Sequence, residues 1–464
     1  MTAAPPLCDA EPDTAVVARP ERWRHDQVGM AIGAAMAIAF FVPGYLRYVN
    51  RWAVLDLALF DQAAWLLSQG RAPELTVLRE NLFGDHVSVV VVAFAPLYRI
   101  AATPVWLIAA QAMALGCSVP ALRALARQIG GSQGWATLAT VGSAPLWAAA
   151  TFDFHPVVMT VPITAAALAA ARRDDTRAAT VAGILLALVR ADACVMLLGV
   201  AVLARGRTRR RLVAVAGLSM TVGVAVPALL HSEQTFARYW GHLGESPLDA
   251  LAHPWRAIPA VVAPSVLETA IIWLLPVGFL VLARPRWAAA VAIAGLPLLL
   301  SSAAATSVTW FHHAAALVPF TVGGAVAALA GPRRRLEHPA LLVTGVVAAL
   351  LVGSPFAPGH PPELRLTDIS RPRAVPGLDA ALAQVEPDDG VAVEVRLLPA
   401  VSRRTTAIDI SAALDAGDPT SALADVDVII VGPERVDEVT DLGWEPAGPT
   451  AHPHDLVALR RDDG

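Results

Sequence analysis

Charged residues are scarce in this chain of 464 residues: Asp, Glu, Lys and Arg make up only 16% of it, whereas hydrophobic residues make up 56%. The mean hydropathy is +0.55. Soluble globular domains carry about 25% charged residues, so this composition excludes a soluble protein of the same length. It indicates an integral membrane protein.

Lysine is absent, and all 35 basic residues are arginine. The chain is also rich in Ala, Pro and Gly, and these biases together are typical of a GC-rich genome rather than of a nucleic-acid-binding surface. We therefore expect no nucleic-acid partner.

Cysteines and the motifs of soluble enzymes are also few. Of the three cysteines, Cys8 precedes the first apolar run, and Cys117 and Cys194 lie inside apolar stretches. No pair is placed for a structural disulfide. The chain has no Walker loop, no GxGxxG after a strand, no GxSxG elbow and no CxxC, which excludes the soluble-enzyme classes that depend on these motifs.

Long apolar runs are what the sequence does have. The first, residues 28–46, follows three arginines as in a signal sequence, but FVPGYLRY at its end lacks a small-x-small cleavage site. We interpret it as an uncleaved anchor. Further runs of spanning or near-spanning length are residues 104–122, 135–150, 157–171, 212–230, 266–283, 287–305, 312–330 and 339–353.

The arginines predict the topology. Six clusters hold 18 of the 26 arginines before residue 354. Arginine in short loops disfavours translocation, so the clusters should share the cytoplasmic side, with an even number of crossings between them. This places the N-terminal tail, residues 1–27, in the cytoplasm and the long loop 47–103 outside. The clusters are residues 19–24, 123–127, 172–177, 205–211, 284–286 and 333–335.

One apolar stretch, residues 178–204, has arginines at both ends and reads LVRADACV in its middle. A single crossing would break the alternation, so we predict two half-length helices that meet at Arg190–Asp192. This gives about eleven membrane helices in an all-α membrane domain, residues 28–353. Charges at such depth usually face a partner or a functional site. Arg190 and Asp192 could neutralise each other at the turn, or Arg190 could contribute to a phosphate-binding pocket.

The C-terminal part is a separate acidic unit. Residues 354–464 hold 9 arginines against 20 acidic residues. Acidic residues cross membranes with little penalty, so we expect this part outside. Residues 354–377 are Pro-rich and predict a linker. Residues 378–464 predict a small α/β domain, with a helix at 378–385, buried strands at 390–397 and 426–431, and an edge strand at 456–460.

The predicted topology collects residues capable of chemistry on the outer side. In the first loop, residues 56–65 have helical spacing and predict a short helix along the membrane surface. Residues 87–100 predict a second interfacial helix, or alternatively a true span. The candidate site residues are Asp56, Asp61, Asp85, His86, Asp153, His155, Asp192, His312 and His313, together with Arg190.

Structural roles compete with functional ones at most of these positions. Asp56 and Asp153 could cap helices, and Asp61 could lie on a solvated face. Asp85 and His86 could be an interfacial cap and a hydrogen-bonded imidazole. The pair His312-His313 could anchor a helix at headgroup level beside Trp310. A divalent metal on Asp85, His86, Asp153 and His155 is possible by residue type, although the spacing is not diagnostic.

Several motifs together resemble a known family. They are LDLALFDQAAWLLSQG, GDHVSVVVVAFAPLYRI, LIAAQAMALG around Gln111, FDFHP, the buried RAD and TWFHHAAALVPF, in order over residues 45–330. This set resembles the bacterial predicted membrane proteins called domain of unknown function 2079. That family is similar in layout to the GT-C glycosyltransferases, in which a long first external loop with two membrane-parallel helices carries an essential carboxylate.

The resemblance implies site residues. Asp56 matches the loop carboxylate, and Asp61 is the second candidate. The chain departs from the family pattern in two places, because it has Arg190-Ala191-Asp192 where Lys-Glu-Asp is usual, and His312-His313 where His-Tyr is usual. The first change keeps the charge type, and the second removes a tyrosine.

The resulting hypothesis is a GT-C-like glycosyltransferase of the bacterial inner membrane, which moves a sugar from a polyprenyl-phosphate donor to an extracytoplasmic glycan, lipid or protein. Asp56 would act as the base. Arg190, with His86 or His155, would neutralise the phosphate leaving group. The alternatives are a lipid or solute transporter such as a flippase, and a non-catalytic membrane scaffold that holds a partner with its acidic tail.

Overall fold

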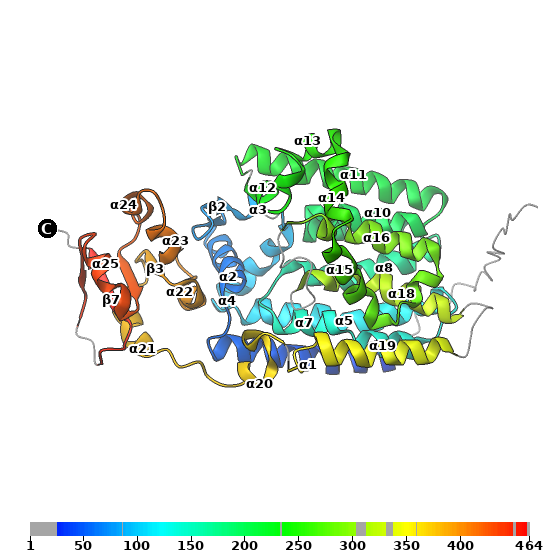
Figure 1. Ribbon diagram of the computed structural model, residues 1–464, viewed down its shortest axis with the longest axis horizontal. Helices are drawn as coiled ribbons and strands as arrows, with labels where there is room; N and C mark the ends of the chain where they lie inside the picture. The colour runs from blue at the N-terminus through cyan, green and yellow to red at the C-terminus, as the bar shows by residue number, and fades with distance from the viewer. Residues whose placement is uncertain are drawn as a thin grey trace, which may run out of the picture.

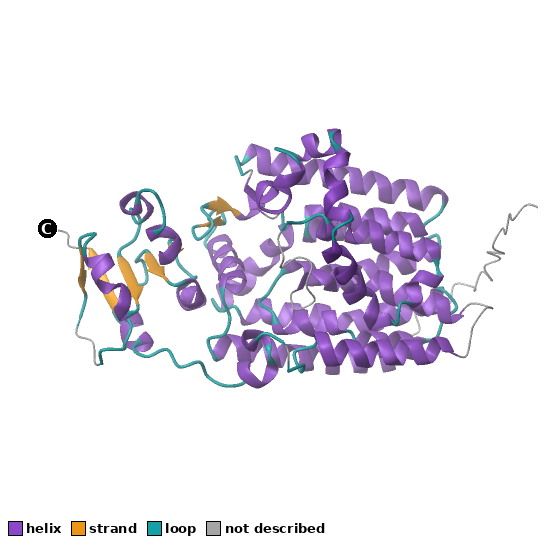
Figure 2. Ribbon diagram, viewed as in Figure 1, coloured by secondary structure: helices purple, strands orange, loops and turns teal. Residues whose placement is uncertain are grey.

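The computed structural model divides into a helical bundle and a small α/β unit at one end of it (Figures 1 and 2). The described residues are 26–85, 87–232, 234–302, 312–330, 337–358, 360–448 and 452–461. The first long loop, with helices α2 and α4, lies between the bundle and the α/β unit (Figure 1). The prediction of a mostly helical membrane domain with a small C-terminal sheet is confirmed.

Four helical segments of the described chain are long and apolar enough to cross a membrane. They are α1 (Gln27–Val49), α5 (Val105–Gln128), α11 (Gly206–Leu229) and His312–Ala330, which comprises η8 (His312–Leu317) and α18 (Val318–Ala330). The pair Pro254–Val261 and Val266–Val277, bent by 71°, would be a fifth. Six further apolar helices have only 10–17 residues, short of the roughly 20 that a span requires. The expected count of eleven membrane helices is therefore not confirmed.

The shorter helices fill the bundle between these spans. They are η2 (Pro156–Met159), α8 (Thr160–Arg172), α9 (Thr176–Val189), η3 (Ala191–Ala193), α10 (Cys194–Leu203), α16 (Pro285–Leu299) and α19 (Glu337–Gly353). Between α11 and α16 lie α12 (Gln234–Trp240), η4 (Gly241–Leu243), α13 (Pro247–Ala252), η5 (Pro254–Ala257), α14 (Ile258–Val261), α15 (Pro264–Leu274), η6 (Leu275–Val277) and η7 (Leu280–Ala283).

Two of the predicted spans are broken. The run 135–150 divides into α6 (Gln133–Val141) and α7 (Ala144–Thr151), because Pro145 has no amide proton to continue the hydrogen bonds of α6 and is suited to a helix start. The run 266–283 breaks after η6, where Gly278 and Phe279 have φ angles of 58° and 59°. The left-handed backbone of these two residues ends the helix.

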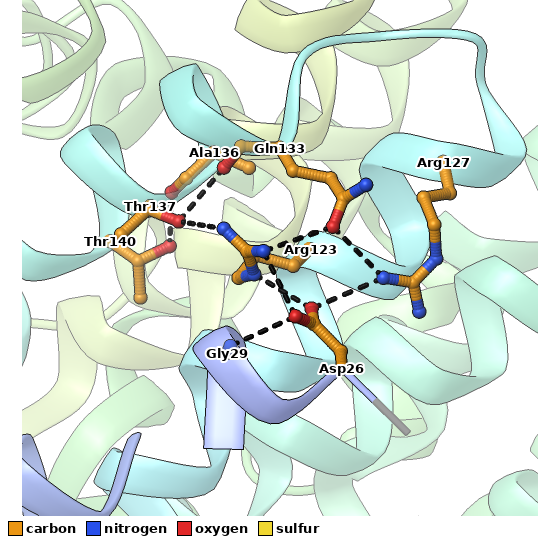
Figure 3. A network of polar contacts seen from close by, with 8 residues as sticks. All are labelled: Asp26, Gly29, Arg123, Arg127, Gln133, Ala136, Thr137 and Thr140. Carbon is orange, nitrogen blue, oxygen red and sulfur yellow. Dashed lines mark hydrogen bonds and ion pairs between the residues drawn. The ribbon is translucent and has the colours of Figure 1, made fainter. Parts of the chain in front are cut away.

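Helices α1 and α5 pack closely along their length, and a polar network joins the N-terminal end of α1 to the C-terminal end of α5 (Figure 3). Asp26 accepts hydrogen bonds from Arg123 Nε at 2.7 Å and from Arg127 Nη1 at 3.1 Å. Gln133 Oε1 accepts from both arginines, which adds α6 to the network. The hydrogen bond from Arg123 holds the pKa of Asp26 far below its usual range, although burial acts in the opposite direction. We call this the arginine end of the bundle.

The segment around Arg190 leaves the arginine end and returns to it. Helix α9 ends at Val189, Arg190 is extended (φ −156°, ψ 135°), and α10 follows η3. The start of α9 lies beside the start of α11 (Gly206–Leu229), which follows α10: the hydroxyls of Thr176 and Thr208 are 2.7 Å apart, and Thr208 donates to Asp174 at 2.7 Å. The prediction of two half-length helices that meet at Arg190–Asp192 is confirmed.

The first loop is a compact layer of short elements. Residues 56–65 form part of α2 (Leu55–Ser68), as predicted. The elements that follow are β1 (Glu74–Leu75), β2 (Glu80–Asn81), α3 (Leu82–Asp85), η1 (Val89–Phe94) and α4 (Ala95–Ile100). Residues 87–100 form η1 and α4, which together are only 12 residues long and change helix type, short of the roughly 20 residues of a span. Their interfacial position stays a prediction.

The C-terminal unit contains a five-stranded mixed sheet in the order β4-β3-β5-β7-β6. Its strands are β3 (Val391–Val393), β4 (Ala407–Asp409), β5 (Val428–Val431), β6 (Trp444–Pro446) and β7 (Val457–Arg461). The helix expected at 378–385 is α21 (Leu378–Leu382). The prediction that residues 456–460 are an edge strand is wrong, because the short strand β6 pairs with the far side of β7. Strands β4 and β6 have three residues each and leave little pattern in the sequence.

The linker and the C-terminal unit both pack on the first loop. Asn50 Nδ2 donates to the carbonyl of Ile369 at 2.8 Å, and Trp52 Nε1 donates to the carbonyl of Arg371 at 2.8 Å. Ala58 of α2 is buried in the same hydrophobic cluster as the sheet residues Val391 and Ile430 and the two end residues of α22 (Leu398–Val401). The C-terminal unit thus covers one face of α2.

Candidate functional site

Helix α2 presents its two candidate carboxylates in different directions. Asp56 lies in the first turn, and Phe60 lies one turn later on the same face. Asp61, five residues beyond Asp56, is rotated by about 140° around the helix, at about 3.6 residues per turn. Helix α2 begins at Leu55 without a side-chain cap, so the alternative that Asp56 is the N-cap is wrong.

The Asp56 face of α2 lies near a cluster of charged residues and a tyrosine from three other elements. We call Asp56, Asp85, Arg190, Arg238 and Tyr239 the outer cluster. Arg238 Nη1 lies 3.7 Å from Asp85 Oδ1. Burial, followed by the charge of Asp85, raises the pKa of Tyr239; Asp56 adds to this rise, and Arg238 and Arg190 oppose it. Asp56, Asp85, Arg190 and Arg238 are therefore all within electrostatic reach of the Tyr239 hydroxyl.

Arg190 and Asp192 pair with each other at the turn between α9 and α10. Arg190 Nε donates to Asp192 Oδ1 at 2.8 Å, and Nη2 donates to Oδ2 at 2.6 Å. This bidentate geometry is the strong form of an arginine–carboxylate contact. The third nitrogen, Nη1, is shielded from solvent and has no hydrogen-bond partner among the described residues. The pair therefore neutralises most of its own charge and leaves one donor unused.

Three imidazoles lie beside the same face of α2, a stacked pair and a third ring tilted against it by 45°, and we call them the histidine stack. The rings of His155 and His312 are parallel within 14° with centroids 4.0 Å apart, and His313 is 4.0 Å from His312. Phe60 meets the His155 ring edge-on at 5.3 Å. His155 is 5% exposed and His312 is 3% exposed, so His312 is not an anchor at headgroup level. Trp310, its expected neighbour there, lies outside the described residues.

Asp153 has a structural partner that the sequence did not indicate. Arg47 Nε donates to Asp153 Oδ1 at 2.9 Å, and both side chains are almost fully buried, at 2% and 1% exposure. The other carboxylate oxygen accepts from the backbone amide of Val54 at 2.8 Å. Asp153 does not cap a helix, because His155 occupies the N-cap position of η2. This ion pair joins the end of α1 to the FDFHP turn and fixes the start of α2.

Asp61 faces the C-terminal unit rather than the outer cluster. It is fully buried, and it accepts hydrogen bonds from Tyr98 Oη at 2.6 Å and from Ser402 Oγ at 2.6 Å. Arg403 Nε lies 3.8 Å away. Next to it, Gln62 Nε2 donates to Thr76 Oγ1 at 2.8 Å. The expectation of a solvated face for Asp61 is wrong, and its contacts are those of a domain interface.

We predict that docking of the C-terminal unit depends on Asp61 and weakens as the pH rises. Burial raises the pKa of Asp61, against the charge of Arg403 and the hydrogen bonds from Ser402 and Tyr98. A group whose pKa is higher in the folded state stabilises that state at low pH, and this contribution is lost as the pH rises through the folded-state pKa. Limited proteolysis of the linker 354–377 across a pH series should show faster cleavage at higher pH.

Two substitutions at Asp61 separate the role of its hydrogen bonds from that of its charge. Asp61→Asn can still bond both hydroxyls but cannot titrate, so cleavage should become independent of pH. Asp61→Leu leaves two buried hydroxyls unsatisfied at about 1–3 kcal/mol each, and cleavage should be fast at every pH. Equal cleavage of the wild type and both variants would show that Asp61 does not hold the interface.

The remaining predicted site residues are only partly placed. His86 lies outside the described residues. Within the described parts of the chain, the structure has no group of three or more His, Cys, Asp or Glu side chains placed to hold a metal ion. Of the candidates, Asp56, Asp85 and Arg190 belong to the outer cluster, and Asp192 is hydrogen-bonded to Arg190. His155, His312 and His313 form the stack, whereas Asp61 and Asp153 belong to structural contacts.

Two residues of the site were missed from the sequence, and a third, Gln111, was noted only as part of a motif. Arg238 and Tyr239 lie on α12, in a stretch with no predicted span, and Tyr239 is one of only four tyrosines in the chain. Gln111 donates to the carbonyl of Ala149 at 2.9 Å and accepts from the backbone amide of His155 at 3.0 Å. A lone glutamine inside a membrane span is a signal that could have indicated such a buried backbone contact.

Comparison with known proteins supports the family seen in the sequence motifs. The family model described as "Predicted membrane protein (DUF2079)" matches residues 51–447, which is most of the chain and includes nearly all of the first loop, the bundle apart from α1, and most of the C-terminal unit. A match of this extent shows the family. No curated protein matches the chain.

Proposed function

We propose, from the premise that this chain belongs to the DUF2079 family of predicted membrane proteins, that it is a GT-C-like glycosyltransferase. It would transfer a sugar from a polyprenyl-phosphate donor to an extracytoplasmic acceptor. The proposal includes a bacterial inner-membrane location with the N-terminus in the cytoplasm and the C-terminal unit outside. It also includes a GT-C-like bundle in which the shorter apolar helices complete the membrane domain.

The outer cluster is the observation that carries this proposal. In it the charge of Asp56, on the first-loop helix α2, acts on the hydroxyl of Tyr239, and the charge of Arg190, at the turn of the α9–α10 pair, acts on the same hydroxyl. A charged arginine at such a turn and a carboxylate on an interfacial helix are what a lipid-linked phosphate and a hydroxyl acceptor require. Side chains held on short, packed helices are also preorganised, which is where electrostatic stabilisation of a transition state is most effective.

Asp56 would act as the general base of the transfer. The acceptor hydroxyl oxygen forms a bond to the anomeric carbon, and the bond from that carbon to the phosphate oxygen breaks. Asp56 takes the hydroxyl proton, and the electron pair leaves with the polyprenyl phosphate. A base in this position typically contributes about 10²–10⁴-fold to the rate.

Arg190 would stabilise the departing phosphate. Its buried Nη1 is a donor without a partner among the described residues, which suits an acceptor oxygen that is absent from the protein itself. The histidine stack, with His155 against Phe60 of α2, would supply further positive charge when protonated. His86 is proposed for the same role from its place in the sequence.

A non-catalytic scaffold is the second candidate, and two contacts favour it. Asp192 already engages two of the three guanidinium nitrogens of Arg190, and Asp61 holds the acidic C-terminal unit on α2. In a scaffold these contacts would serve the structure alone and would need no substrate. A lipid or solute transporter remains the third class, and no contact of the described residues favours it over the other two.

The test uses the purified full chain in liposomes with polyprenyl-phosphate sugars that are radiolabelled in the sugar, and cell-envelope glycans as acceptors. We expect transfer of label from at least one donor, with release of polyprenyl phosphate. A repeat with a chelator decides whether a divalent metal takes part. Failure to bind or turn over any donor would refute the proposal in favour of the scaffold, whereas movement of intact donor across the bilayer would favour the transporter.

A further inference from the structure

A row of large apolar side chains is exposed along residues 247–262, where α13, η5 and α14 connect α12 to α15. Their positions recur every three or four residues, which is the spacing of one helical face. All five are between 58% and 72% exposed, so the described residues leave the row uncovered. We call this row the apolar stripe; it consists of Leu248, Leu251, Trp255, Ile258 and Val262.

The charged side chains of the same stretch lie at other positions and pair with one another. Positions 249, 253 and 256 are again three or four residues apart. Arg256 Nη1 donates to Asp249 Oδ2 at 2.7 Å, and His253 Nδ1 lies 2.7 Å from Asp249 Oδ1. A protein interface usually has polar groups around its apolar centre, and here such groups are already engaged with each other. The stretch is therefore amphipathic, with one face that fits hydrocarbon.

The direction of the stretch also fits a membrane surface. The segment Pro254–Val261 is bent by 71° from Val266–Val277. The second segment packs in the bundle, since Trp273 is buried and its ring lies against Gly295 of α16. In contrast, η5 and α14 contain no buried residue. An amphipathic helix at 71° to a helix that enters the bilayer lies close to the membrane plane.

The apolar stripe lies between helices whose exposed apolar surface faces lipid. Helix α11 before it is a candidate span, and the chain leaves this span at Leu229 and Leu230, which are both exposed. Leu267 and Ile271 of α15, after the stripe, are exposed as well. Trp255 suits a position between these spans and water, because tryptophan is enriched at membrane–water interfaces. The stripe thus continues the lipid-facing surface of the spans on either side of it.

We propose that residues 247–262 lie in the headgroup region of the membrane, with the apolar stripe inserted among the acyl chains. The leaflet is the one opposite the arginine end, because α11 starts at that end and its 24 residues lead away from it. Arg256 Nη1 also contacts the carbonyl of Leu243 at 3.4 Å, in η4, which directly follows α12. Figure 1 shows α12, α13 and α14 on one side of the bundle, away from α1 and α19. Contact with lipid would therefore set the level of α12 in the membrane, whatever reaction the protein performs.

The test is spin labelling of the full chain in phosphatidylcholine nanodiscs, with the native cysteines replaced by alanine. One label at a time is placed by Leu251→Cys or Ile258→Cys. Collisions with oxygen, which concentrates among acyl chains, and with a water-soluble nickel chelate report the depth of each label. We expect both labels about 5–10 Å inside the headgroup boundary. Exposed apolar positions calibrate the scale: Leu218→Cys on α11 for lipid and Val395→Cys on the C-terminal unit for water.

Two further variants test whether the apolar stripe itself holds the stretch in lipid. Ile258→Asp should move the label at position 251 towards water, because a charged side chain opposes insertion. Ala260→Asp makes a charged change on the side of the paired residues and should leave the depth of that label unchanged. Collisions at 251 and 258 like those at Val395 would overturn the proposal. Few collisions with either reagent would also overturn it, since a second copy or another protein would then cover the stripe.

Discussion

Asp56→Asn is expected to abolish glycosyl transfer while expression and folding stay at wild-type levels. Asparagine keeps the size of aspartate and can make similar hydrogen bonds, but it cannot accept the proton of the acceptor hydroxyl. Loss of a general base lowers the rate by about 10²–10⁴-fold. The measurement is the initial rate of label transfer in liposomes, with protein amount and melting behaviour compared in the same preparation.

Asp61→Asn is the matched control, because it makes the same chemical change in the same helix. Asp61 is fully buried against Tyr98 and Ser402, so its variant should keep transfer within a few-fold of wild type. A wild-type rate in Asp56→Asn would remove Asp56 from the mechanism. An equal loss in both variants would show that the effect comes from disturbing α2 rather than from removing a base.

Asp56 and Asp61 differ in a feature that the sequence does not predict, namely which part of the protein each carboxylate faces. Both carboxylates lie in one short motif, and the helix that contains them could be predicted from its spacing. The face that each occupies against the rest of the protein could not, because Ser402 is 341 residues away from Asp61. Docking of the C-terminal unit on α2 is a tertiary event that leaves no local pattern.

The positions of the arginines predicted the helices of the bundle better than the lengths of the apolar runs did. The arginines on both sides of residues 178–204 predicted the half-length pair correctly, because translocating arginine is costly enough to fix a topology. The length of an apolar run was a weaker guide to the helices. The run 135–150 breaks at a proline, and the run 266–283 breaks at a left-handed backbone. Apolar length also cannot tell a span from a helix that is buried in the bundle.

Buried polar contacts were the least predictable part of the site. Asp153 was a candidate for chemistry because it lies in FDFHP on the outer side, yet its partner Arg47 stands 106 residues earlier at the end of α1. In the sequence, Arg47 is indistinguishable from an ordinary flanking arginine of a first span. Only the packing of α1 against the FDFHP turn gives the pair its role.

Asp153→Leu is expected to lower the free energy of unfolding by about 3–5 kcal/mol, because it leaves Arg47 as an uncompensated buried charge. Arg47 Nε and the amide of Val54 both lose their acceptor on Asp153. The measurement is thermal or denaturant unfolding of the purified protein in detergent. Wild-type stability together with lost transfer would contradict the structural role and place Asp153 among the functional carboxylates.

The double variant Arg47→Met/Asp153→Leu should recover only part of the lost stability. Replacing both partners of a buried ion pair by apolar side chains of similar volume is often neutral or stabilising. Here the pair also serves two backbone groups, since Asp153 accepts from the amide of Val54 and Arg47 donates to the carbonyl of Glu363. A backbone group that loses its partner while shielded from water costs about 1–3 kcal/mol, and both of these contacts are partly buried. Full recovery in the double variant would show that these two backbone contacts contribute nothing, and that the ion pair does not fix the start of α2 or hold the linker against α1.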